Sequence, residues 1–125
     1  VEKAIDIIPI PGANSTIAAL ISSGLPTDKF YFGGFPPRKP GKRTRFFEDL
    51  KDRSETMIFF ESPHRLMKSI NSMHKAFGER RIALCRELTK KFEEIIRGTL
   101  AEFARGEKEI KVKGEFVIVI EGNRE

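Results

Sequence analysis

Hydrophobic residues are arranged along the chain in two distinct patterns. Two uninterrupted apolar runs, Met57–Phe60 and Phe116–Ile120, are too short for helices and are typical of strands that are covered on both faces. After the first run, apolar residues recur every three or four positions, at Leu66, Ile70, Met73 and Phe77. That spacing predicts an amphipathic helix whose apolar stripe packs against the rest of the protein.

The same criteria predict a sheet assembled from several such strands. Further strands are predicted at 3–10, 29–35, 81–87 and around Ile95–Ile96. Helices are predicted after the strands at 29–35, 57–60 and 95–96. The strands at 81–87 and 92–98 are joined too tightly for a parallel crossover, so we expect them to be antiparallel. The predicted fold class is therefore α/β, with a mixed, roughly five-stranded sheet flanked by helices and Phe116–Ile120 as its best central strand.

Turn and capping residues add detail to this prediction. Gly33–Gly34 indicates a bulge or a close backbone approach in the strand at 29–35. Ser62 is predicted to be the N-cap of the helix after Phe60, with Pro63 at its first position. Thr99 and Glu102 have the spacing of a capping box.

Three polar residues follow the first buried strand directly: Glu61, His64 and Arg65. In open α/β sheets, ligands tend to bind where strands end and helices begin. Glu61 fits a general base or a carboxylate that binds a hydroxyl group. It fits equally well a structural ion pair with Arg65, four residues later. The spacing favours neither interpretation.

A second candidate ligand site precedes the sheet. The turn at Pro11–Gly12 is followed by Asn14 and Ser15, either of which can cap a helix that carries Ile17 and Leu20. Amides at a helix start beside two small polar side chains suit a polar ligand. An ordinary capped helix after a hinge explains the same residues.

Positive charge is concentrated in one segment of a chain of 125 residues with a net charge of +5. The segment contains Arg38, Lys39, Lys42, Arg43 and Arg45. We expect it to form a basic loop before a helix that buries Phe46 and Phe47. Such a cluster fits either a solvated face or contact with a phosphate backbone.

Several classes of site and location are poorly supported. The single cysteine, Cys85, excludes a disulfide framework and a cysteine metal site and favours a reducing compartment. His64 and His74 are ten residues apart in one predicted helix, so we expect no metal site. No glycine-rich phosphate loop is present, and no apolar run approaches the roughly 20 residues of a membrane span. We therefore expect a cytoplasmic protein without a membrane partner.

Short motifs distributed over nearly the whole chain occur together in the order of one family. They are Pro11-Gly12-Ala13-Asn14-Ser15, Gly24-Leu25-Pro26-Thr27-Asp28, Gly34-Phe35 with Pro37-Arg38-Lys39, Phe60-Glu61-Ser62-Pro63-His64-Arg65, Arg86-Glu87-Leu88-Thr89-Lys90, Glu93-Glu94 with Arg97-Gly98-Thr99-Leu100, and Lys113-Gly114-Glu115-Phe116 with Glu121-Gly122. With these motifs the sequence resembles the ribosomal RNA small subunit methyltransferase I family. That family belongs to the tetrapyrrole methylase superfamily of class III methyltransferases.

The resemblance implies an enzyme that uses S-adenosylmethionine to methylate the ribose 2′-hydroxyl of a cytidine in small-subunit (16S) ribosomal RNA. It covers only the family's C-terminal half, so the fragment alone is expected to be inactive. Residues 1–12 would be the end of an N-terminal domain with the interdomain hinge, and residues 13–125 the C-terminal domain. The implied partners are the N-terminal domain of the same protein, the small ribosomal subunit or its RNA, and a second copy in a homodimer.

The resemblance also implies roles for individual residues. Asn14, Ser15, Glu61 and Leu88 would line the methyl donor's side of the cleft between the two domains. Glu61 or, as second choice, His64 would accept the proton of the sugar hydroxyl. The RNA backbone would be contacted by Arg38, Lys39, Lys42, Arg43 and Arg65.

Two other classes of protein fit parts of the sequence. Half of a tetrapyrrole or other small-molecule methyltransferase would share the fold, but a small substrate would not need the basic segment. A plain RNA-binding or interaction domain without chemistry of its own would also explain the basic segment, and it would describe a fragment that holds only half of the cleft.

Overall fold

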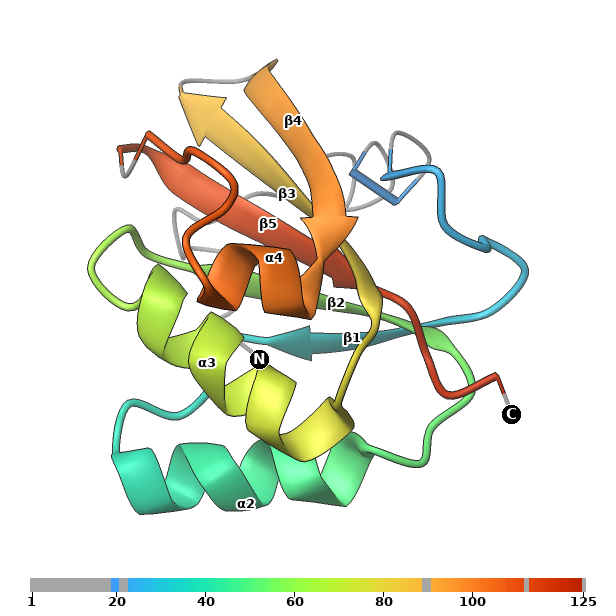
Figure 1. Cartoon of the computed structure of the whole chain (residues 1–125). Coiled ribbons are helices and arrows are strands. Elements are labelled where there is room, and N and C mark those ends of the chain that lie inside the picture. Colours follow the sequence, from blue (N-terminus) through green and yellow to red (C-terminus); the bar gives the residue numbers. More distant parts are fainter. Residues whose placement is uncertain (1–18, 21–22, 89–90, 112, 125) are drawn as a thin grey trace, which may run out of the picture.

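The computed structural model describes residues 19–20, 23–88, 91–111 and 113–124 (Figure 1). Its elements are β1 (Phe30–Gly34), α2 (Pro40–Leu50), β2 (Thr56–Glu61), α3 (Leu66–Phe77), β3 (Arg81–Leu88), β4 (Lys91–Thr99), α4 (Leu100–Ala104) and β5 (Glu115–Ile120). The predicted strand at 3–10, the capping residues Asn14 and Ser15, and the division at residues 1–12 lie outside the described residues.

The five strands form one mixed sheet in the order β1-β2-β5-β3-β4. β1 and β2 are parallel, whereas the pairs β2–β5, β5–β3 and β3–β4 are antiparallel. The predicted fold class is thus confirmed, as are the central place of Phe116–Ile120 and the antiparallel pairing of β3 and β4. Helices follow the first, second and fourth strands, as the pattern predicts.

Apolar side chains from both faces of the sheet are buried, which explains the uninterrupted apolar runs. Helices α2, α3 and α4 lie over one face (Figure 1), where Met57 and Phe59 of β2 join their buried residues in the larger core cluster. Ile58 and Phe60 point to the opposite face, into a second cluster that includes Leu20 and Leu25. The two clusters alternate along β2, β3 and β5 because successive side chains point to opposite faces.

Two predicted helix starts are wrong. Ser62 does not cap α3, which begins at Leu66 with Arg65 at its N-cap position and no side-chain cap. The reason is a turn between strand and helix, in which the Arg65 amide donates to the Ser62 carbonyl over 3.2 Å. The expected basic loop is partly helical, since α2 already begins at Pro40. By contrast, the capping box of Thr99 and Glu102 is confirmed at α4.

The two glycines of β1 confirm the predicted irregularity. The register of β1 against β2 shifts between Phe32 and Gly34, and Gly34 has a φ of +69°. Any Cβ on Gly33 would meet the ring of Phe59, so the backbone approaches that ring closely. The strand therefore has both a bulge and a close approach.

The Glu121 carboxylate is held by Arg81 at the end of the sheet opposite that bulge. The Arg81 amide donates to Glu121 Oε1 over 3.0 Å, and the Arg81 guanidinium donates to Oε2 over 3.1 Å. Burial alone would raise the pKa of Glu121, but the hydrogen bonds and charge of Arg81 outweigh it and hold this pKa below its ordinary value. The ionised form is therefore the one that stabilises the fold.

We expect Glu121→Gln to lower the free energy of unfolding by about 1 kcal/mol at neutral pH, the usual worth of a hydrogen bond. Because the pKa is lower in the folded state, the stabilisation is complete above the unfolded pKa of about 4.3 and is lost as the pH falls through the folded value. Urea unfolding of both proteins between neutral and acidic pH should show the difference shrinking only in acid. Glu48→Gln, which removes an exposed partner of Lys51, is the control. A difference between wild type and Glu121→Gln that persists unchanged in acid would contradict this assignment.

Candidate functional site

The ends of three strands lie along one edge of the sheet, here called the carboxyl edge. β1, β2 and β3 run in the same direction, because β2 and β3 are both antiparallel to β5 between them. In the register across this edge, Glu61 lies opposite Phe116, which in turn lies opposite Arg86. The residues after Glu61 therefore occupy the edge at which open α/β sheets bind ligands, as the sequence predicts.

The Glu61 carboxylate is buried, with 1% of the residue exposed, and both its oxygens are engaged. Oε2 accepts a hydrogen bond from the Ser69 hydroxyl over 2.5 Å, and Oε1 accepts one from the Ser62 amide over 3.0 Å. The Arg65 guanidinium adds an ion pair at 3.4 Å. Of the two interpretations left open by the sequence, the structure contains the ion pair with Arg65. Glu61 ties the end of β2 to helix α3.

Sequence reasoning missed Ser69 as the partner of Glu61. Ser69 is buried in α3, three residues after Leu66 and thus on the apolar face of the helix. A polar residue on such a face must find a hydrogen-bond partner inside the protein. The position of Ser69 on the apolar face could therefore have predicted a buried hydrogen bond. The spacing does not say which residue accepts it.

Ser62 is the second residue whose role the sequence did not reveal. Its hydroxyl oxygen is buried and has no hydrogen-bond partner, the one such side-chain atom among the residues that the structure describes. A buried hydroxyl without a partner costs about 1–3 kcal/mol, and a polar group of a ligand would satisfy it. The serine-proline sequence suggested a helix cap, which hid this possibility.

The other predicted residues of the carboxyl edge differ in exposure. His64 is exposed in the turn after β2, and Arg65 is half-buried beside Glu61. Leu88 is the last residue of β3, where it pairs with Lys91. Glu61, His64, Arg65 and the backbone of Leu88 thus occupy the same edge, whereas Asn14 and Ser15 lie outside the described residues.

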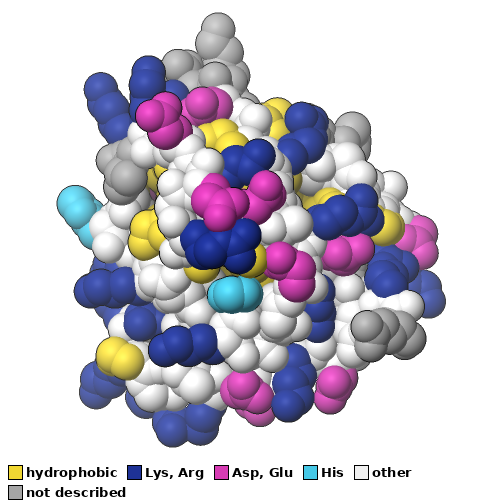
Figure 2. Space-filling view, viewed as in Figure 1, with side chains coloured by type: hydrophobic (Ala, Val, Ile, Leu, Met, Phe, Trp, Pro, Cys, Tyr) yellow, Lys and Arg dark blue, Asp and Glu magenta, His cyan; other side chains and the backbone are white. Residues whose placement is uncertain are grey.

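The basic segment surrounds the start of α2. Figure 2 shows Lys and Arg side chains gathered at the lower left, over the beginning of α2 in the same view as Figure 1. Four of its cations are exposed: Arg38, Lys39, Lys42 and Arg45. The first turn of α2 contains no acidic residue. Because a helix N-terminus carries a partial positive charge, these cations destabilise the helix start unless an anion lies close to them.

Arg43 does not belong to this exposed group, and its predicted contact with the RNA backbone does not fit its position. Only 7% of the residue is exposed. Its Nε donates to the Ser72 hydroxyl and its Nη1 to the Arg38 carbonyl, each over 3.0 Å. Arg43 precedes the buried Phe47 by four residues, so the helix turns it toward α3 and away from solvent.

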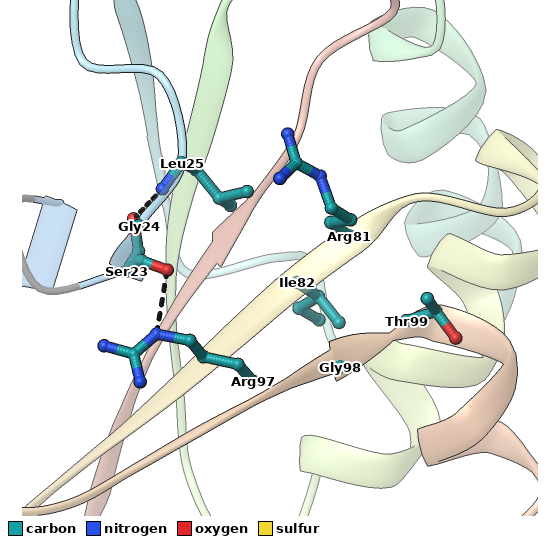
Figure 3. Close-up of a pocket in the computed structure, with 8 residues that line it drawn as sticks. All are labelled: Ser23, Gly24, Leu25, Arg81, Ile82, Arg97, Gly98 and Thr99. Atoms are coloured by element: carbon teal, nitrogen blue, oxygen red, sulfur yellow. Dashed lines mark hydrogen bonds between the residues drawn. The ribbon is translucent and has the colours of Figure 1, made fainter.

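A hollow of about 340 Å³ lies at the opposite edge of the sheet (Figure 3). It is lined by Ser23, Gly24, Leu25, Arg81, Ile82, Arg97, Gly98 and Thr99. The Arg97 Nε donates to the Ser23 carbonyl over 3.2 Å, and the Arg81 guanidinium binds Glu121. Since both arginines hold protein groups, the hollow is best explained as part of the packing of residues 23–25 against β4.

Metal ligation and membrane insertion find no support in the described residues. These residues contain no group of three or more His, Cys, Asp or Glu residues that could hold a metal ion. None of their helices is long and apolar enough to cross a membrane. Cys85 is buried in β3, and this burial raises the pKa of its thiol to about 12, so the thiol stays protonated.

Comparison with known proteins gives a consistent result. Residues 1–104 match the family model of tetrapyrrole (corrin/porphyrin) methylases. The chain is 47% identical to a protein of Halalkalibacterium halodurans over all its 125 residues, which are 43% of that relative. It is 45% identical to a protein of Bacillus subtilis over 117 residues, which are 94% of the chain and 40% of that relative. A relative from Streptococcus pyogenes serotype M1 is 40% identical over 122 residues, which are 98% of the chain and 42% of the relative.

All three relatives carry the name ribosomal RNA small subunit methyltransferase I. The chain spans about two fifths of their length. The family model matches well over half of the chain, and the mixed α/β sheet is consistent with its fold. The chain therefore belongs to the tetrapyrrole methylase family, and its curated homologues are the small-subunit ribosomal RNA methyltransferases of that family.

Proposed function

We propose that this chain is the C-terminal half of an S-adenosylmethionine-dependent methyltransferase that methylates a cytidine 2′-hydroxyl in small-subunit ribosomal RNA. The names of its relatives support the ribosomal RNA substrate. The observation that carries the proposal for this chain is the group of four exposed cations at the start of α2. A tetrapyrrole or another small substrate would give no reason for them.

The placement of these cations is unfavourable for the isolated domain. Arg38, Lys39, Lys42 and Arg45 repel one another and also the positive end of the helix dipole. A chain of phosphates relieves both effects, and it releases counterions when it binds. The geometry therefore favours a nucleic acid backbone over a merely solvated face.

The carboxyl edge offers a polar group for the methyl donor, although not the one expected. Both oxygens of Glu61 are already engaged by protein groups, so Glu61 does not fit a direct contact with the donor. The unpartnered Ser62 hydroxyl does fit one, because it can donate to a polar atom of the ligand. Asn14, Ser15 and Leu88 remain proposed contacts from the other parts of the cleft.

When bound, S-adenosylmethionine supplies an electrophilic methyl group that a hydroxyl oxygen can attack in line. The residues of this chain then have to orient the sugar and accept or pass on its proton. His64 is exposed at the carboxyl edge and is our first candidate for the proton acceptor, and Glu61 acts by positioning Arg65 and the turn. The N-terminal domain and a second copy of the chain are the proposed protein partners, and the cytoplasm is the proposed location.

Salt dependence of RNA binding tests the proposal on this chain. Alanine at Arg38, Lys39, Lys42 and Arg45 should reduce the slope of log affinity against log salt by about 0.7 for each phosphate of single-stranded RNA that is no longer neutralised. The matched control replaces four exposed lysines outside the segment, Lys51, Lys75, Lys111 and Lys113. Filter binding or fluorescence anisotropy over a range of salt concentrations gives the slopes. Equal slopes in wild type and in the variant with four alanines would show that the segment is a solvated face that does not contact the RNA backbone.

A further inference from the structure

Three phenylalanines are exposed along the edge strand β1 and directly after it. Phe30, Phe32 and Phe35 are 41%, 47% and 42% exposed. In the described part of the chain, these three are the large hydrophobic residues that are exposed to solvent. Leaving such rings in water forfeits the stabilisation that their burial would give. An exposed apolar patch on an otherwise charged domain indicates a binding surface.

The backbone of β1 brings two of these rings onto one face. Phe32 and Phe35 are three residues apart, a spacing that would place them on opposite faces of a regular strand. The register shift after Phe32 and the positive φ of Gly34 change this, since both rings contact Phe60. Their centroids lie 5.1 and 5.5 Å from that of Phe60, with edge-to-face angles of 67° and 66°.

The buried Phe60 thus acts as a rigid support for the two exposed rings. It is 2% exposed, and its strand β2 is paired on both sides. Phe30 lies two residues before Phe32 and therefore on the same side of β1. The three rings form an exposed aromatic surface, here called the phenylalanine platform, in which Phe60 supports Phe32 and Phe35.

The exposed cations follow the platform directly in the chain, and an RNA strand bound to both would pass around the edge strand β1, because α2 covers the opposite face of the sheet from Phe60. Arg38 follows Phe35 after only Pro36 and Pro37, so the two Cα atoms are at most about 11 Å apart. Proteins that hold single-stranded nucleic acids combine a cationic path for the backbone with aromatic side chains on which bases stack. A purely apolar protein partner would explain the rings but not the cations that follow them in the chain.

We propose that the phenylalanine platform stacks unpaired bases of the RNA whose phosphates are bound by Arg38, Lys39, Lys42 and Arg45. This inference rests on the proposed function, because it concerns how the same RNA is held. The platform provides little sequence preference, since every base has a face on which a ring can stack. It selects RNA whose bases are unpaired over an intact duplex.

The test replaces the flat aromatic rings by side chains that are apolar but cannot stack on a base. In Phe32→Leu combined with Phe35→Leu the side chains stay apolar but are no longer flat, whereas the matched variant with Tyr at both positions keeps the rings. The probe is a short single-stranded RNA that contains 2-aminopurine, whose fluorescence falls when the base stacks. We expect the leucine variant to bind about five- to tenfold more weakly for each base that loses its stacking partner and to lose the quenching. The tyrosine variant should behave like wild type.

Other outcomes separate this inference from the proposed function. If wild type binds RNA with the expected salt slope and the leucine variant binds and quenches equally well, the platform is wrong and the proposed function stands. If wild type binds no RNA, both fail. If sedimentation shows a wild-type dimer that the leucine variant loses while its RNA affinity is unchanged, the platform is a contact between copies and the inference is overturned. Should the double variant fail to fold, Phe30→Leu, which leaves both ring contacts with Phe60 in place, repeats the test.

Discussion

Alanine in place of Gly122 should lower the free energy of unfolding of this domain by about 3 kcal/mol, the upper part of the usual range for overpacking. Gly122 directly follows β5, where the chain passes the segment before β2. A Cβ built there would overlap the main-chain oxygens of Ser54 and Glu55 and would lie 2.5 Å from the carbonyl carbon of Ser54. A side chain could rotate away from such a clash, but backbone atoms cannot.

The chain is anchored on both sides of Gly122, so Gly122 cannot move away from residues 54 and 55. The Asn123 amide donates to the Arg53 carbonyl over 2.7 Å, and the Glu121 amide donates to the Arg81 carbonyl over 2.9 Å. Making room for a methyl group at position 122 therefore strains the connection between the central strand and its neighbours. A local adjustment of one loop is not enough.

Thermal or urea unfolding of Gly122→Ala measures this effect, and Gly78→Ala is the matched control. Gly78 has a φ of +75°, but a Cβ there would meet nothing within 4 Å. Its φ of +75° with a ψ of −148° is a conformation that glycine alone adopts readily, so its replacement should cost about 2 kcal/mol of backbone strain without any clash. If Gly122→Ala is no more destabilising than Gly78→Ala, the segment at 53–55 yields easily and the proposed anchoring is wrong.

The strand arrangement could be predicted because burial on both faces leaves a direct trace in the sequence. Met57–Phe60 and Phe116–Ile120 are uninterrupted apolar runs, and the structure buries every residue of both in adjacent strands. The short connection between β3 and β4 likewise allows only one relative direction. Such features depend on length and polarity alone, which the sequence contains in full.

The side-chain contacts that the sequence did not reveal depend on residues far apart in the chain or on the packing of neighbouring elements. Arg43 looks like its basic neighbours, and only Ser72 of α3, which lies 29 residues away, explains why it is buried. Ser62 has the local sequence of a helix cap, but the turn that follows β2 delays the helix and leaves its hydroxyl without a partner. Local preferences are weak compared with the way in which strand, turn and helix must pack together.

Glu61→Ala should also destabilise the domain strongly, by about 3 kcal/mol, since removing one partner of a buried ionic network leaves the others unsatisfied. The Ser62 amide, the Ser69 hydroxyl and the half-buried Arg65 would all lose their acceptor. Glu61→Gln keeps the shape and one carbonyl oxygen, so its cost should be smaller, about 1–2 kcal/mol. Glu107→Ala is the control, because the ion pair of Glu107 with Arg105 has a shorter distance, 2.6 Å, but both side chains are at least half exposed.

Urea unfolding of these variants gives the change in the free energy of unfolding. Methyl transfer to RNA, measured in a longer protein that contains this chain, gives the change in turnover. If Glu61 positions the turn, turnover should fall in step with stability and Ser69→Ala should reproduce part of the loss, because it removes the donor to Oε2. A general base behaves differently: Glu61→Gln would abolish turnover at little cost in stability, and Ser69→Ala would leave turnover nearly intact. If Glu61→Ala is as stable as Glu107→Ala, the structural role of Glu61 is wrong. There is then no reason to prefer His64 to Glu61 as the proton acceptor.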